Sequence, residues 1–88
     1  MDTRIAVMSI IVENPEVVEQ LNSLLHTYSD YIIGRMGIPY RTKARKVNII
    51  SLALDAPQDT ISALAGKVGK LSGISVKTAL SNVVNYDA

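Results

Sequence analysis

The chain of 88 residues contains no cysteine, no tryptophan and no phenylalanine. The lack of cysteine excludes disulfides, thiolate-ligated zinc, cysteine-bound iron–sulfur clusters and a cysteine nucleophile, and it suits a reducing compartment. The four tyrosines are the whole supply of large aromatic rings, so few side chains could stack on nucleic-acid bases. The net charge of +1 gives no general attraction to polyanions either.

Long hydrophobic runs are also absent. The best apolar run extends from Ile5 to Val12 and is interrupted by Ser9, which is far short of the roughly 20 residues that cross a bilayer. The opening residues, with Asp2 beside Arg4, lack the pattern of an export signal. We therefore expect a cytoplasmic protein with no membrane association. Hydrophobic residues make up 48% of the chain and charged residues 19%, a balance typical of one small folded domain.

Four segments have the β-branched, apolar character of strands. The first and third are apolar at both odd and even positions, as in strands that are covered on both faces. The four predicted strands are residues 5–12, 31–38, 47–54 and 74–80.

Two segments have apolar residues at spacings of three and four, which predicts amphipathic helices. The first helix is expected from about Pro15 to Tyr28, with Asn14 as its N-cap and Pro15 in the first helical position. The second is expected between Asp55, as a possible cap that pairs with Gln58, and Gly73.

The resulting order is β-α-β-β-α-β, and the two halves repeat at an offset that lays Pro15 on Pro57. Right-handed crossovers then place both helices on one face of a four-stranded antiparallel sheet. We predict an α+β ferredoxin-like sandwich, with residues 1–81 as a single domain and residues 82–88 as a C-terminal tail.

The second face of this sheet has no helix to cover it. The central strands carry apolar side chains on both parities, so either orientation leaves several exposed in a monomer. A patch of that size on a small domain usually marks an interface. We expect the chain to associate with itself through the sheet, most simply as a homodimer, with a tetramer as the alternative.

Candidate catalytic and metal-ligating residues are few. His26 is the single histidine, and without cysteine it has too few companions for a metal site. Glu13, Glu16 and Glu19 surround a helix N-terminus, where the helix dipole explains them. No nucleophile motif or phosphate-binding glycine loop is present. We expect no enzymatic activity, no cofactor and no metal.

Two polar features could still bind a partner. In the segment Gly34–Tyr40, the glycines allow close approach of a ligand and Arg35 supplies charge, or Arg35 and Pro39 protect an edge strand from stray pairing. The sequence leaves both interpretations open. The basic residues that follow suit a solvated turn better than a nucleic-acid contact, because no recognition helix accompanies them; they are Arg41, Lys43, Arg45 and Lys46.

The string Gly-Arg-Met-Gly-Ile-Pro-Tyr at residues 34–40 is the most specific part of a resemblance that covers the whole chain. The sequence resembles the iron-only hydrogenase system regulator family, small ACT-like domains associated with hydrogenase maturation genes. Weaker matching stretches are residues 4–7, 13–16, 48–51, 55–58 and 74–77. The resemblance implies an ACT-like fold, an oligomer and a regulatory role.

A more distant similarity is to the C-terminal domain of nickel-responsive regulators. Those domains bind nickel through histidine and cysteine and follow a ribbon-helix-helix segment that binds DNA. This sequence has His26 alone and shows no such segment before its first strand. Neither nickel binding nor direct DNA binding is carried over.

The sequence therefore predicts a non-catalytic regulatory module, an ACT-like homo-oligomer that binds a small ligand or a protein partner. By analogy with the fold, the expected ligand-binding residues are Glu13, Asn14, Pro15, Arg35 and Gly37. The alternative function is a nucleic-acid-associated transcriptional regulator that uses the basic hairpin at residues 41–46.

Overall fold

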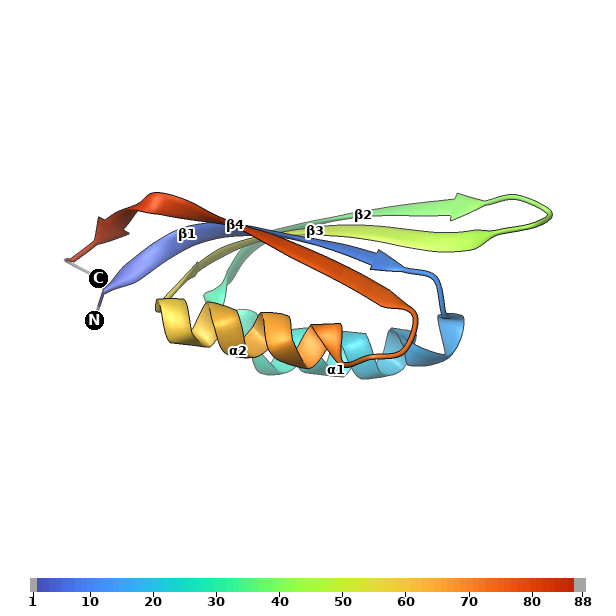
Figure 1. Ribbon diagram of the computed structural model, residues 1–88, viewed down its shortest axis with the longest axis horizontal. Helices are drawn as coiled ribbons and strands as arrows, with labels where there is room; N and C mark the ends of the chain where they lie inside the picture. The colour runs from blue at the N-terminus through green and yellow to red at the C-terminus, as the bar shows by residue number, and fades with distance from the viewer. Residues whose placement is uncertain (1, 87–88) are drawn as a thin grey trace.

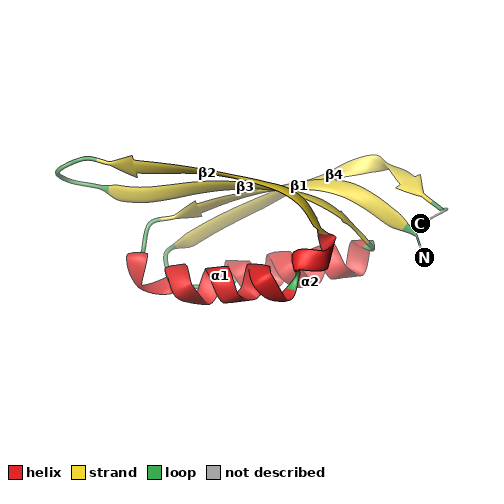
Figure 2. Cartoon of the chain, turned by 180° about the vertical axis from the view of Figure 1, so that it is seen from behind, coloured by secondary structure: helices red, strands yellow, loops and turns green. Residues whose placement is uncertain are grey.

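The computed structural model describes residues 2–86. Four strands form one antiparallel sheet in the order β2-β3-β1-β4, and two helices cover one face of it (Figures 1 and 2). This arrangement confirms the predicted ferredoxin-like α+β fold. The elements in chain order are β1 (Thr3–Val12), the 3-10 turn η1 (Pro15–Val17), α1 (Val18–Thr27), the 3-10 turn η2 (Ser29–Tyr31), β2 (Ile32–Arg41), β3 (Lys46–Ala56), α2 (Gln58–Gly69) and β4 (Ile74–Asn85).

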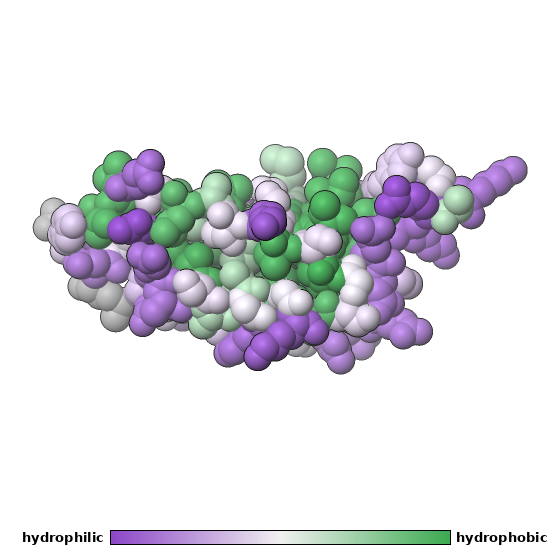
Figure 3. All heavy atoms as spheres, viewed as in Figure 1, coloured by the Kyte–Doolittle hydropathy of each residue, from purple (hydrophilic) through white to green (hydrophobic). Residues whose placement is uncertain are grey.

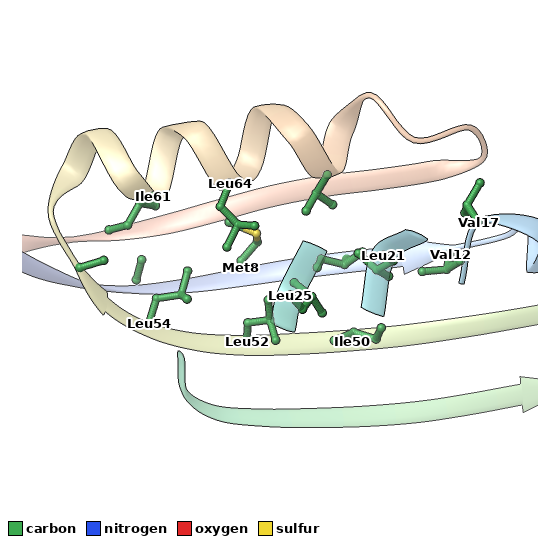
Figure 4. Close-up of a cluster of buried hydrophobic side chains, with 14 residues drawn as sticks. Met8, Val12, Val17, Leu21, Leu25, Ile50, Leu52, Leu54, Ile61 and Leu64 are labelled. Carbon is green, nitrogen blue, oxygen red and sulfur yellow. The ribbon is translucent and has the colours of Figure 1, made fainter. Parts of the chain in front are cut away.

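The core lies between the sheet and the two helices. Met8 from β1 and Leu52 from β3 are fully buried, and they lie under Leu21 of α1 and Leu64 of α2 (Figure 4). Burying side chains of this size stabilises the fold by about 1.5–3 kcal/mol each. The helix stripes predicted from the sequence supply this layer.

The two strands that are apolar on both faces occupy the middle of the sheet, as predicted. The structure also shows which of the alternating side chains, those at even or those at odd positions of β1, face the helices. In β1, Met8 and Ile10 are buried beneath the helices, whereas Val7 and Ile11 are exposed on the opposite side. We call this second side of the sheet the open face.

The two helices begin differently. Asn14 accepts a hydrogen bond from the backbone amide of Glu16 at 3.0 Å, and Pro15 occupies the first turn, as predicted. The predicted cap at Asp55 is wrong: Asp55 pairs with Ile5 inside the sheet, and Pro57 occupies the N-cap position without a side-chain hydrogen bond. The strand continues through Asp55 because β1 remains available as its partner.

Two strands extend further than expected. β2 continues through Pro39 to Arg41, which is possible because β2 is an edge strand and proline has no ladder hydrogen bond to lose there. β4 continues to Asn85, so residues 82–85 are strand where a tail was expected. Thr3 pairs with Asn85, beyond a bulge, and this pairing accounts for the extra length. Residues 87–88 of the expected tail lie outside the described residues.

The β2–β3 hairpin extends beyond the layer of helices, and both chain ends lie at the other end of the molecule (Figure 1). This gives the domain an elongated form of 49 × 18 × 17 Å. The hairpin tip is closed by the Thr42 amide, which donates to the Arg45 carbonyl oxygen at 2.8 Å. The candidate site lies between this hairpin and α1.

Candidate functional site: a hollow beneath the hairpin and an open sheet face

A β-bulge decides where Arg35 points. Ile32 pairs with Leu54 but Gly34 pairs with Ala53, so Ile33 is an extra residue in β2. Beyond the bulge, Arg35 is paired with the buried Leu52, and it therefore lies on the side of the helices. Without the extra residue, every later side chain of β2 would turn to the opposite face.

A hollow of about 220 Å³ lies between this part of β2 and α1. Its apolar wall comes from α1 and from the neighbouring strands. The residues that form this wall include Val18, Leu21, Pro39 and Ile50. Its polar groups belong to Asn22, Arg35 and Asn48, and Gly37 forms part of the roof. The hollow therefore combines an apolar surface with a small set of polar groups, as ligand sites usually do.

Two guanidinium groups hold the two amide side chains of the hollow. Arg35 donates from Nη2 to Asn22 Oδ1 at 3.1 Å, and Arg41 donates from Nη2 to Asn48 Oδ1 at 3.1 Å. Both amide oxygens are thus engaged as acceptors, which leaves the NH₂ end of each amide as its donor group. The polar side of the hollow is rich in donors.

Gly37 has a particular place in the hollow. It pairs with the buried Ile50, so a side chain at this position would point toward the helices. A Cβ built on Gly37 would have no heavy atom within 4 Å. The missing side chain therefore leaves space inside the hollow.

The five residues predicted to bind a ligand separate into two groups. Arg35 and Gly37 line the hollow together. Glu13 follows Val12, which also lines it, but the Glu13 carboxylate forms an ion pair with Arg45 at 2.8 Å. The other two, Asn14 and Pro15, build the start of the first helix. Ligand binding by these residues stays a prediction.

Sequence reasoning missed Asn22 and Asn48 as members of the hollow. Both occupy polar positions within otherwise apolar segments, and such positions are usually solvent-exposed. Asn48 pairs with Pro39 and with Val12 across the sheet, so its partners come from two distant segments. Only the strand register brings Asn48 next to the residues of α1.

The basic residues of the hairpin are partly engaged within the chain. Arg41 donates from Nη1 to the carbonyl oxygens of Tyr40 and Val47, each at 3.1 Å, and Arg45 is paired with Glu13. Lys43 and Lys46 are exposed near the tip. The guanidinium groups of this cluster therefore brace the hairpin, and a nucleic-acid role for it stays a prediction.

The open face carries several large apolar side chains, with Ser9 and Ser51 paired between them on the central strands. Ile38, Ile49 and Ile11 form one row across three strands. Seven large apolar side chains of this face have exposed fractions of 40–66%. They are Ile5, Val7, Ile11, Met36, Ile38, Tyr40 and Ile49. Figure 3 shows hydrophobic atoms along the upper side of the molecule, where the sheet lies, and hydrophilic atoms at its lower edge.

His26 lies exposed in the last turn of α1. Within residues 2–86, no group of three or more histidine, cysteine, aspartate or glutamate side chains is placed to hold a metal ion. In the same part of the chain, neither helix has both the length and the apolar character that a membrane span requires.

Comparison with known proteins supports the fold described above. Protein TM1266 from Thermotoga maritima has a structure similar to this one, with a TM-score of 0.79 and 39% identity over 89% of this chain and 96% of that chain. No curated protein sequence matches the chain significantly.

More distant structures share the fold. The ACT domain of GTP pyrophosphokinase from Chlorobium tepidum has a TM-score of 0.62 and 17% identity, over 92% of this chain and 90% of that chain. The nitrogen regulatory PII-like protein CPII from Thiomonas intermedia K12 has a TM-score of 0.60 and 13% identity, over 97% of both chains. The fold is therefore ACT-like.

The resemblance found from the sequence is confirmed at the level of the family. Residues 4–78 match the TM1266-like family, which carries the provisional description of an iron-only hydrogenase system regulator. The match includes the Gly34–Tyr40 string and both helices. The chain belongs to the TM1266-like family of iron-only hydrogenase system regulators.

Proposed function

We propose that this chain is a non-catalytic regulatory module of the iron-only hydrogenase system, which assembles with copies of itself through the open face and responds to a small ligand. The observation that carries the proposal is the row Ile38, Ile49 and Ile11 on a sheet face that no helix covers. The family description supports the regulatory role. A structural neighbour that is named a nitrogen regulatory PII-like protein is consistent with it.

The size of the open face fits a second copy of the chain. Strands of 10–12 residues rise about 3.4 Å per residue and lie about 4.8 Å apart, so four of them give a face of roughly 700 Å². A standard interface buries about 800 Å² on each partner. Full contact between two open faces would approach that area.

The charges of the open face also favour self-association. By register, Lys77 of β4 and Asp55 of β3 belong to this face. One charge of each sign lets two copies meet without net repulsion. An 88-residue domain has a small core, and burial of this second apolar surface would add to its stability.

Ligand binding and assembly would be linked through the hairpin. Gly37 and Ile50 line the hollow, and their chain neighbours Ile38 and Ile49, which also contribute to its lining, have exposed side chains on the open face. A ligand in the hollow that restricts the motion of β2 and β3 would also restrict the side chains of these strands on the open face. Such a ligand favours one assembly state if it binds that state more tightly.

The experiment is sedimentation equilibrium of the purified chain at micromolar concentration. We expect a dimer or a tetramer, and its dissociation should release hydrophobic surface that binds the dye ANS. A particle of 9.5 kDa that stays monomeric at tens of micromolar would contradict the proposed assembly. A hydrogenase-system protein that binds the open face in place of a second copy would also contradict it.

A further inference from the structure

From the donor set of the hollow we infer that its ligand is a small apolar monocarboxylate without an amino group. This inference rests on the proposed ligand-binding function and specifies the chemical class of the ligand. Of the described residues that line the hollow, Arg35 is the one that carries charge, and that charge is positive. An anionic ligand would accept a charge-assisted hydrogen bond from the Arg35 guanidinium group.

The two amides strengthen this selection. The side-chain oxygens of Asn22 and Asn48 accept hydrogen bonds from Arg35 and Arg41. The NH₂ group of each amide therefore remains available as a donor. Three side chains of the lining then carry donor groups, which are those of Asn22, Arg35 and Asn48. A carboxylate offers only acceptors, with about four lone-pair directions, and matches such a set. An ammonium group would be repelled by Arg35.

The apolar part of the hollow determines which hydrocarbon group of the ligand it can hold. Val18, Leu21, Pro39 and Ile50 present apolar surface, and Gly37 leaves room where another residue would have a side chain. An engineered apolar cavity of about 150 Å³ holds benzene. The hollow, at about 220 Å³, therefore has space for a branched or cyclic body of similar size.

The test is a nuclear magnetic resonance titration of the full ¹⁵N-labelled chain with three probes of one shape. These are 3-methylbutanoate, its uncharged amide 3-methylbutanamide, and L-valine, which is the same acid with an ammonium group added at the carbon next to the carboxylate. We expect the carboxylate to shift the side-chain amide signals of Asn22 and Asn48 and the backbone signal of Gly37. The amide should bind at least about tenfold more weakly because it loses a charge-assisted hydrogen bond, and L-valine should do so because its ammonium group is repelled.

Two variants and one control test whether the carboxylate binds in the hollow. Arg35→Gln removes the charge from an exposed side chain and should weaken carboxylate binding by about tenfold or more. Gly37→Val should abolish it by filling the hollow, while the melting temperature shows that the fold is kept. Lys43→Gln removes the same charge at the hairpin tip and should leave binding unchanged.

Equal binding of 3-methylbutanoate and its amide would overturn the inference, as would equal weakening by Arg35→Gln and Lys43→Gln. If L-valine shifts the signals of the hollow and 3-methylbutanoate does not, the exclusion of an amino group is wrong, but the ligand-binding function stands. If none of the three probes shifts them, the assignment is also overturned. Sedimentation of the same samples reports on the proposed assembly independently.

Discussion

The backbone amide of Glu13 donates a hydrogen bond to the carbonyl oxygen of Gly73 at 2.9 Å. This bond ties the turn after β1 to the turn before β4, which are 60 residues apart in the chain. Gly73 has a positive φ of 74°, and a Cβ on it would lie 2.5 Å from the Cβ of Asn14. The corner beside the first helix therefore requires glycine at position 73.

Gly73→Ala should destabilise the domain by about 2–4 kcal/mol, because alanine is strained at positive φ and its methyl group would clash with Asn14. Urea unfolding measures this loss. The matched control is Gly66→Ala, whose new methyl group meets no heavy atom within 4 Å in α2. It should stabilise the helix by about 0.5–1 kcal/mol. Equal stability of the two variants would show that the corner relaxes freely.

Ile11→Lys should convert the assembled form into a monomer. Ile11 lies in the apolar row of the open face, and a lysine there would carry its charge into the proposed interface. Sedimentation equilibrium detects the change. Ala63→Lys places the same charge on the exposed side of α2 and should leave the assembly intact. If Ile11→Lys sediments like the parent chain, the open face is not the interface.

The ion pair between Glu13 and Arg45 should contribute little to stability. Its atoms are 2.8 Å apart, but the two side chains keep 48% and 61% of their surface exposed. A double-mutant cycle with Glu13→Gln and Arg45→Gln should give a coupling below about 1 kcal/mol, which 1 M salt should remove. A larger coupling that resists salt would mean that the pair is buried, for example by a second copy of the chain.

The basic hairpin should not retain duplex DNA at about 150 mM salt, because Arg41 and Arg45 already bond within the chain. A gel-shift titration with hydrogenase-operon DNA checks this expectation. A retained complex would support the alternative of a nucleic-acid-associated regulator. In that case the double variant Lys43→Gln, Lys46→Gln should reduce the salt slope by about two, and an unchanged slope would exclude the hairpin as the contact.

Much of the fold could be predicted because it depends on local patterns. The strands and helices follow from residue spacing, and the cap at Asn14 follows from the Asn-Pro-Glu sequence. The errors occurred where a partner strand outweighed a local signal. Asp55 is a good helix cap in isolation, but pairing with Ile5 keeps it in the sheet. In the same way, pairing with β1 keeps residues 82–85 in a strand.

Less of the candidate site could be predicted. The sequence points to Arg35 and Gly37 because glycine and arginine are unusual in a strand, but it gives no sign of Asn22 because a polar residue on a helix is ordinary. The partners of Arg35 depend on the bulge at Ile33, which the sequence marks only by nearby glycines. A shift of one residue would have placed Arg35 on the open face and left the hollow without its charge.

The sequence by itself determined the number and order of the elements, the central place of the two strands that are apolar on both faces, and the presence of apolar side chains on both faces of the sheet. These follow from periodicity and from how much surface two helices can shield. Only the tertiary structure decided which parity faces the helices and that the Asn22 and Asn48 oxygens are engaged by guanidinium groups. Those outcomes depend on strand register, which is set by contacts between residues far apart in the chain.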